Sequence, residues 1–301
     1  MSEQNHTYFH KQLLSWYKDV GRKLPWRETN DPYKILVSEI MLQQTQVSRV
    51  IDKYDSFIRQ FPDVYSLAQA SKSTVIREWS GMGYNKRAVN LHRTAQIIVQ
   101  NHNGQVPKSL ESLVALPGIG RYTASAIANF AFKLRVPVVD INIKRVIGRG
   151  DHGSSFDTDK LAWDTATKYL PEKTKTPDWH QALMDLGATV CTSRKPSCES
   201  CPIVLNCSAS IRFVFTKNNT KMGTPSSKKT NPTFVGSNRF YRGRIVEELR
   251  GRIDPIEIDK LGSLIKPDYS AHTDKIWFEK LINTLVKDGL IEKEKGMASL
   301  P

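Results

Sequence analysis

The chain has 301 residues, of which 25% are charged and 39% hydrophobic, and it carries a formal net charge of +14. A chain of this length can bury one or two cores, so we expect a main domain and a smaller second one. No apolar run is long enough to span a membrane, and the first residues lack the apolar region of a secretory signal. These features exclude a membrane-spanning protein and predict a cytoplasmic one without disulfides. The excess of positive charge favours a polyanionic partner, either nucleic acid or an acidic membrane surface.

Apolar residues recur mainly every three or four positions from residue 6 to about residue 190. This spacing predicts a mainly α-helical domain, because three to four residues make one helical turn. Four polar residues stand directly before apolar stretches of this kind, where helix caps are expected. They are Ser73, Ser109, Thr158 and Asp178.

The composition changes after the last cysteine. Residues 217–232, KNNTKMGTPSSKKTNP, are rich in small and polar residues and contain no acid, which is typical of a linker. We therefore divide the chain into a domain over residues 1–215, a linker over 216–232 and a second, basic domain over 233–301. Within the second domain, RFYRGRIVEELRG, PIEIDKLGSLI and DKIWFEKLINTLVKDG indicate short helices, and GLIEKEKGMASL indicates two strands around a glycine turn. This order suggests a small winged-helix-like α/β module, although a simple cap on the main domain stays open.

All four cysteines of the chain fall in one short stretch, CTSRKPSCESCPIVLNC. Four thiols this close together in a reducing compartment indicate a metal site. Structural zinc usually takes two CxxC-like pairs, and here only one such pair occurs. An iron–sulfur cluster tolerates uneven spacing better, because each thiolate binds a different iron. Spacing alone does not decide whether zinc or an iron–sulfur cluster is bound. The ligands in either case would be Cys191, Cys198, Cys201 and Cys207.

Residues 116–140, LPGIGRYTASAIANFAFKLRVPVVD, combine a glycine-rich turn with a distant aspartate. A dinucleotide-binding motif is one candidate, but Thr123 stands where that motif needs a third glycine, and helical spacing precedes the turn. Because Gly118 and Gly120 have no side chains, a phosphate could approach the N–H groups of the turn and of the helix that follows. The stretch therefore predicts a helix, a tight hairpin and a second helix, which either grip nucleic acid without reading sequence or form a plain αα-turn.

Asp140 ends the apolar run VPVVD and precedes INIKRVIGR. One interpretation is an N-cap of the helix that begins there. The other is a carboxylate held against a substrate, because Lys144 and Arg145 follow within about one turn.

Several motifs together resemble a known family. LPGIGRYTASAI followed by VVDINIKRV, the Cys-x6-Cys-x2-Cys-x5-Cys loop and YKILVSEIMLQQTQVSRV resemble the helix-hairpin-helix base-excision DNA glycosylases with an iron–sulfur loop. SEIMLQQTQV and WHQALMDLGATVCTSRKPSC are similar to the adenine DNA glycosylases of the MutY type. The resemblance covers about residues 6–208. It implies a helix-hairpin-helix glycosylase fold, a [4Fe–4S] cluster on the four cysteines at 191–207, and double-stranded DNA with a mismatch as partner of a monomeric enzyme, nucleoid-associated if bacterial.

The resemblance also implies catalytic residues. Glu39 would protonate the adenine and help to activate water, and apolar neighbours on a helix would raise its pKa. Asp140 would stabilise an oxocarbenium-like sugar, and Asn142 would orient the sugar or the water. Tyr122 occupies the position where bifunctional relatives similar to endonuclease III carry a lysine that attacks the sugar. Tyrosine cannot form a Schiff base, so a monofunctional glycosylase is expected.

A further set of residues matches family positions that contact DNA or the flipped base. Leu42, Gln44 and Tyr84 would wedge into the duplex or stack on it, Trp26 and Arg27 would line the adenine pocket, and Leu116, Gly118 and Gly120 would form the hairpin.

The expected function is hydrolysis of the N-glycosidic bond of adenine mispaired with 8-oxoguanine or guanine, in base excision repair. Thymine-mismatch glycosylases also carry tyrosine at the position of Tyr122, so a thymine or endonuclease III-like activity is an alternative. A non-catalytic iron–sulfur DNA-binding regulator is an alternative from another class. Many relatives recognise 8-oxoguanine with a domain related to nucleotide-pyrophosphate hydrolases, and residues 233–301 are too few to form it.

Overall fold

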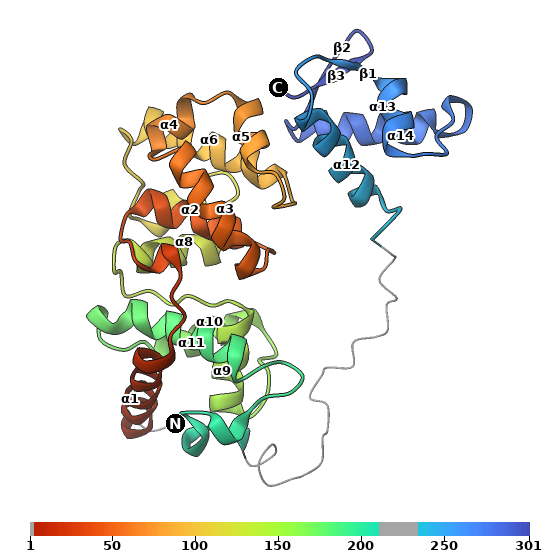
Figure 1. Cartoon of the computed structure of the whole chain (residues 1–301). Helices are drawn as coiled ribbons and strands as arrows, with labels where there is room; N and C mark the ends of the chain where they lie inside the picture. Colours follow the sequence, from red (N-terminus) through yellow and green to blue (C-terminus); the bar gives the residue numbers. More distant parts are fainter. Residues whose placement is uncertain (1–2, 211–233) are drawn as a thin grey trace. The chain divides into compact units, whose positions relative to one another are not determined.

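The computed structural model of the chain describes residues 3–210 and 234–301 and is mainly helical, as predicted (Figure 1). The predicted linker over 216–232 lies outside the described residues. None of the helices in the described ranges combines the length and the apolar character that crossing a membrane requires. The chain forms two compact units. Of the described residues, unit 1 comprises 3–35, 108–114 and 119–210, and unit 2 comprises 36–107, 115–118 and 234–301.

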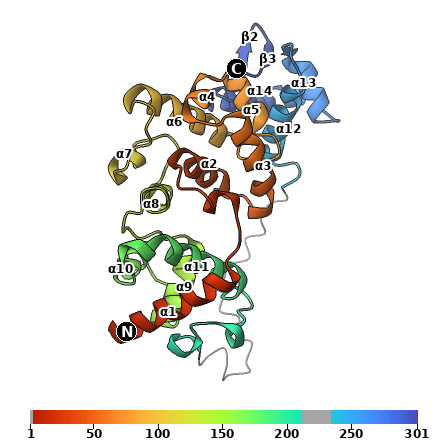
Figure 2. The same ribbon diagram turned by 60° about the vertical axis from the view of Figure 1, so that its left-hand side comes forward.

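Unit 1 is built around helices from both ends of its sequence. The N-terminal helix packs against the last long helix before the cysteine loop, and that helix packs against the one that begins after Asp140 (Figure 2). Aromatic and aliphatic side chains such as Phe9, Leu13 and Trp179 are completely or almost completely buried between them. The helices are α1 (Glu3–Val20), α7 (Leu110–Val114), α8 (Arg121–Phe130), α9 (Ile141–Ile147), α10 (Asp159–Lys168) and α11 (Thr176–Thr189).

Unit 2 contains the helices between Leu36 and Pro107 and the C-terminal part of the chain. Helix α6 packs against α4 and α5, with Leu91, Ala95 and Ile98 fully buried. The helices of the first part are α2 (Pro32–Leu42), whose first turn belongs to unit 1, α3 (Val47–Gln60), α4 (Val64–Gln69), α5 (Lys72–Glu78) and α6 (Lys86–Asn101).

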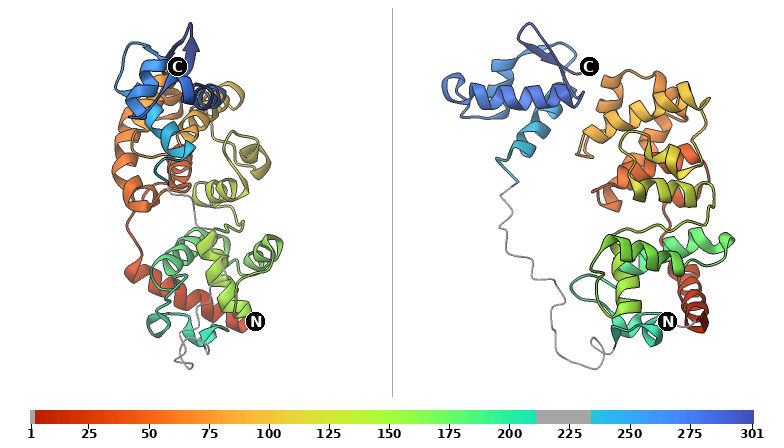
Figure 3. Two further views of the ribbon diagram at one scale, coloured as in Figure 1. Left: turned by 90° about the vertical axis from the view of Figure 1, so that its right-hand side faces the viewer. Right: turned by 180° about the vertical axis from the view of Figure 1, so that it is seen from behind.

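The C-terminal part of unit 2 consists of α12 (Asn238–Arg250), α13 (Ile258–Ile265), α14 (Ala271–Lys287) and a small antiparallel sheet, which are coloured blue in Figure 3. The strand order in this sheet is β1-β3-β2. The strands are β1 (Ile256–Glu257), β2 (Glu292–Glu294) and β3 (Met297–Ser299). The predicted helices and hairpin are confirmed. The turn places Lys295 at φ 46° and Gly296 at φ 81°, which suits a tight hairpin. The prediction of helix at Ile256 was wrong, because this residue pairs with Ala298 in the sheet.

Two of the predicted helix caps are correct. The Thr158 hydroxyl accepts a hydrogen bond from the N–H of Leu161, and the Ser109 hydroxyl accepts one from Ser112. Ser73 was a wrong choice, because Ser71 caps α5 by accepting from the N–H of Thr74.

Asp178 was a wrong choice as well. It lies within the first turn of α11, which already begins at Thr176 with Pro177 at a position where proline is favoured. An acid in the first turn still interacts favourably with the helix dipole, which explains why the pattern resembled a cap.

Candidate active site

The hairpin between α7 and α8 depends on its first glycine. Gly118 has φ 78°, and an added Cβ would lie 2.9 Å from Nδ2 of Asn90. The Gln43 amide donates a hydrogen bond of 3.1 Å to the Gly118 carbonyl. Gly120 is the N-cap of α8 and provides no side-chain cap, and a Cβ there would meet nothing within 4 Å. The turn therefore leaves open space at the start of α8, as an approaching phosphate requires, whereas Leu116 is only 3% exposed.

Asp140 caps helix α9. One carboxylate oxygen accepts a 2.6 Å hydrogen bond from the N–H of Ile143, and the other accepts a 2.8 Å bond from the Asn142 side chain. The prediction of an N-cap is thus confirmed. Burial raises the pKa of the Asp140 carboxyl, although the hydrogen bonds from Ile143 and Asn142 and the charge of Arg145 oppose the shift. The carboxylate is held in one orientation and is poorly solvated, so a nearby positive charge would stabilise it strongly.

Asn142 is itself held by neighbours that sequence reasoning did not identify. Arg145 donates a 2.8 Å hydrogen bond to the Asn142 side-chain oxygen and a 2.6 Å bond to the Gly187 carbonyl. The same guanidinium donates to the carbonyl of Cys191 at 2.7 Å. Arg145 thereby connects the Asp140 segment with the end of α11 and with the cysteine loop.

Replacing Gly187 by alanine is expected to disturb this arrangement, because a Cβ at this position would lie 2.6 Å from the Cβ of Asn142. Overpacking of this kind costs about 1–3 kcal/mol. We expect a lower melting temperature and a lower base-release rate in single-turnover assays. The matched control is Gly251→Ala, where the nearest atom lies at 3.6 Å. Unchanged stability and rate in Gly187→Ala would show that Asn142 tolerates displacement.

A buried polar bridge supports the chain just before Asp140. The Val138 N–H donates to Nε2 of His180 at 3.1 Å, while Nδ1 of the same ring lies 3.0 Å from the Asn129 side-chain oxygen. The Asn129 amide donates onward to the Leu134 carbonyl at 2.8 Å. Burial lowers the pKa of His180 to about 3, so the ring is neutral and can accept from Val138 while donating to Asn129. This bridge joins α8, α11 and the segment that carries Asp140.

Glu39 lies on α2 and is 4% exposed. Its helical neighbours Ile35, Leu36, Val37, Ile40 and Met41 are buried too. The apolar surroundings expected from the sequence are therefore confirmed, and Glu39 does not face the solvent. Leu42, at the end of the same helix, is half-buried.

Trp26 and Arg27 lie in a short helical turn, Pro25–Arg27, of unit 1. Trp26 is buried, and the Arg27 guanidinium donates two hydrogen bonds, of 2.8 and 2.9 Å, to the carboxylate of Asp185. Arg22 binds the same carboxylate at 2.7 Å through Nε. Burial alone would raise the pKa of Asp185, but the hydrogen bonds from Arg27 and Arg22 outweigh it and lower this pKa. Asp185, which holds Arg27 in a fixed position, was not among the residues predicted from the sequence.

Gln44 and Tyr84 are exposed residues of unit 2 with left-handed backbone conformations, at φ 55° and φ 45°. Such conformations cost about 1–3 kcal/mol each in residues other than glycine and concentrate at functional sites. A single guanidinium connects the two loops. Arg87 donates to the carbonyls of Gln43 at 2.6 Å and of Met82 at 3.1 Å, and burial lowers the pKa of Arg87 to about 10.

Tyr122 is the second residue of α8 and is half-buried. It follows directly on the hairpin, so the structure places it beside the backbone turn that the sequence predicts to contact phosphate. No lysine occupies this position.

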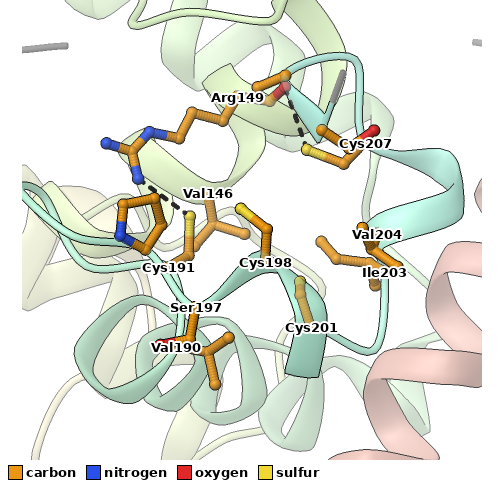
Figure 4. A pocket seen from close by; sticks show the side chains of 13 residues that line it. Val146, Arg149, Val190, Cys191, Ser197, Cys198, Cys201, Ile203, Val204 and Cys207 are labelled. Atoms are coloured by element: carbon orange, nitrogen blue, oxygen red, sulfur yellow. Dashed lines mark hydrogen bonds between the residues drawn. The ribbon is translucent and has the colours of Figure 1, made fainter. Parts of the chain in front are cut away.

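The four cysteines line one cavity (Figure 4). The Arg149 guanidinium donates to the sulfur of Cys191 at 3.4 Å. Burial raises the pKa of Cys198 and Cys207 and raises that of Cys201 to about 12, so these thiols need a cation to become thiolates at neutral pH. Among residues 3–210 and 234–301, no three or more His, Cys, Asp or Glu side chains converge as ligands of one metal ion.

Comparisons with known proteins identify the family. A model of the HhH-GPD superfamily of base excision DNA repair proteins matches residues 37–172. A protein of Mycobacterium tuberculosis H37Rv named adenine DNA glycosylase is 38% identical over 297 residues, which cover 96% of this chain and 92% of the relative. The chain belongs to the adenine DNA glycosylase family. A relative of the same name from Mycolicibacterium smegmatis is 36% identical over 94% of this chain and 92% of its own length.

Solved structures support the same fold for this glycosylase. A thermostable thymine-DNA glycosylase superposes with a TM-score of 0.64 at 31% identity, covering 69% of this chain and 98% of its own. An endonuclease III–DNA complex superposes with a TM-score of 0.61 at 21% identity, which bears on the fold alone. Family membership favours an enzyme over the non-catalytic regulator considered from the sequence.

Proposed function

We propose that this adenine DNA glycosylase hydrolyses the N-glycosidic bond of adenine mispaired with 8-oxoguanine or guanine in duplex DNA, and that it lacks lyase activity. The observation that carries the proposal is Asp140, a poorly solvated carboxylate fixed by two hydrogen bonds at the start of α9. An anion held in this way can stabilise positive charge on a sugar without reorganising.

Glu39 supplies the proton in this proposal. When the C1′–N bond breaks, its electron pair goes to the adenine, which leaves more readily once it is protonated. Water then adds to C1′ and gives a proton to the Glu39 carboxylate, which restores the acid. The burial of Glu39 on α2 supports this role, because a group shielded from bulk water can hold its proton for the reacting base.

Asp140 and Asn142 act on the sugar. The ionised Asp140 carboxylate offsets the positive charge that develops at C1′, and Asn142, bonded to both Asp140 and Arg145, orients the sugar or the attacking water. Tyr122 has no amine to attack C1′, so the reaction stops at an abasic site.

Several exposed or strained groups support base flipping. Extruding a base costs a few kcal/mol and leaves a gap that a side chain must fill. Gln44 and Tyr84, which lie in loops that Arg87 connects and have unusual backbone conformations, would fill it together with Leu42. Trp26 and Arg27 of unit 1 would line the adenine pocket, and Gly118 and Gly120 of the hairpin would admit a phosphate.

An excision assay on four duplexes tests the proposal, with A opposite 8-oxoguanine, G or C, and T opposite G. We expect adenine release that is fastest opposite 8-oxoguanine and slower opposite guanine. Release of thymine without adenine would contradict the proposal and favour the thymine-mismatch alternative.

We also propose a [4Fe–4S] cluster on Cys191, Cys198, Cys201 and Cys207. Zinc needs four sulfurs within about 2.3 Å of one ion, whereas a cluster binds each thiolate to a different iron. Sulfurs spread around one cavity, with Arg149 donating to Cys191, fit the second arrangement. When bound, the cluster would supply the positive charge of its irons, which keeps the thiolates ionised, and it would hold the cysteine loop in one conformation.

Metal analysis tests the cluster. We expect the anaerobically purified enzyme to be yellow-brown and to contain about four irons per chain. Cys198→Ser should lower the iron content, whereas Ser197→Ala, next to it in sequence, should retain it. A colourless preparation that contains zinc would contradict the assignment.

A further inference from the structure

Unit 2 contains a cavity of about 520 Å³ whose lining includes positively charged side chains and no acid. Pockets that hold small ligands measure roughly 300–1,000 Å³, so this cavity is large enough for one nucleotide unit. The cations come from α3, α6 and the C-terminal helix α12, and they are Arg49, Lys86, Arg87, Arg239 and Arg242.

Three of these charges have no acidic partner among the described residues. Lys86 and Arg242 share the carboxylate of Asp288, at 2.7 and 2.6 Å. Arg87 instead donates to backbone carbonyls and a threonine hydroxyl, and neither Arg49 nor Arg239 forms an ion pair within residues 3–210 and 234–301. The cavity therefore keeps a surplus of positive charge, which favours an anionic occupant.

Aromatic rings flank one of the uncompensated cations. The Arg239 guanidinium carbon lies 5.7 Å from the ring centre of Tyr84 and 4.9 Å from that of Phe234, and Arg239 donates to the Tyr84 hydroxyl at 3.3 Å. Both rings stay exposed, at 45% for Tyr84 and 53% for Phe234. Cations beside exposed aromatic rings are the combination with which proteins bind single strands of nucleic acid, through phosphates and stacked bases.

Hydrogen bonds join α12 to α5 and to Asn85, a residue of the cavity lining just before α6. Arg250 donates to the Ile76 carbonyl and to the Asn85 side chain, both at 2.9 Å. Arg77 donates in the opposite direction, to the carbonyls of Arg250 and Arg252. Helix α12 thus presents Arg239 beside Tyr84, one of the residues proposed to enter the duplex.

We propose that the C-terminal part of the chain is a DNA-binding element. In this proposal the cavity binds one nucleotide of the DNA, next to the place where the adenine is flipped out. Arg239 and Arg49 contact its phosphates, and Tyr84 and Phe234 contact its base. The inference rests on the proposed function only in taking duplex DNA as the substrate. Residues 234–301 thereby have a function in DNA binding that is separate from catalysis.

Binding of the full chain to a labelled duplex tests this proposal, with one probe carrying A opposite 8-oxoguanine and the other fully paired. Arg239→Ala should weaken binding several-fold and should reduce the slope of log K against log salt by about 1, as loss of one phosphate contact does. The control is Arg244→Ala, an exposed arginine of the same helix that lines a different cavity. Arg49→Ala should reproduce the effect of Arg239→Ala.

The outcomes separate this proposal from the catalytic one. If Arg239→Ala and Arg49→Ala keep the affinity and the salt slope of the wild type, the cavity does not bind DNA, whatever the enzyme excises. If they lose affinity while the wild type releases no adenine, the cavity binds DNA and the proposed reaction is wrong. Equal losses in Arg244→Ala would indicate a general charge effect and would overturn the assignment to this cavity.

Discussion

Asp140→Asn is expected to slow adenine release by about 10²–10³-fold in single-turnover assays, which is typical when one preorganised electrostatic group is lost. Asparagine can still cap α9, so the helix and the bond to Ile143 should survive. Asp63→Asn is the matched control, because Asp63 is also an N-cap aspartate, on α4. A variant with wild-type rate would show that Asp140 acts as a cap alone.

The pKa of Asp140 also predicts how the free energy of unfolding of the wild type and of this variant should differ with pH. Burial raises the pKa of Asp140 above its ordinary 3.8, so the folded state binds this proton more tightly than the unfolded state does. The ionised carboxylate therefore destabilises the folded wild type at neutral pH, and Asp140→Asn should raise the free energy of unfolding there.

This stability difference should shrink as the pH falls through the raised pKa and vanish below about 3.8, where both states are protonated. The wild-type rate should fall over the same acidic range, because the proposed reaction needs the ionised form of Asp140. Denaturant unfolding and single-turnover rates across acidic pH measure both effects. A variant that is less stable than the wild type at neutral pH would contradict this account of Asp140.

Glu39→Gln is expected to slow adenine release by about 10²–10⁴-fold, the usual contribution of general acid catalysis. Glutamine has the same shape but cannot donate an acidic proton, so DNA affinity should change little. Glu28→Gln, at an exposed glutamate, is the control. A substrate whose base leaves without protonation would show whether the lost activity comes from the missing proton donor. Glu39→Gln should lose far less activity on this substrate. An equal loss on both substrates would show that Glu39 does not act by protonating the leaving base.

Sequence patterns predicted the local elements of this chain well. Helical spacing, the hairpin glycines and the C-terminal turn all reflect short-range constraints, and the structure has the corresponding elements. Errors occurred where a neighbouring residue took the same role, or where a contact distant in sequence overrode the local pattern. Ser71 caps α5 instead of Ser73, and pairing with β3 makes Ile256 part of a strand rather than of a helix.

The supports of the candidate site could not be predicted, because they join residues far apart in sequence. Asp185 clamps Arg27 across 158 positions, and His180 accepts from Val138 across 42. Nothing in the sequence around Gly187 indicates that Asn142 lies close to it. The burial of Glu39 could be predicted, in contrast, because its apolar neighbours lie on the same helix, close to it in sequence.

The most direct test of the proposed reaction follows one duplex with adenine opposite 8-oxoguanine under single-turnover conditions, with and without borohydride. We expect free adenine and abasic sites to form at the same rate, with strand breaks only after alkali and no protein covalently trapped on DNA. Covalent trapping of the wild type, or strand breaks without alkali, would show Schiff-base chemistry and contradict hydrolysis by Glu39 and Asp140.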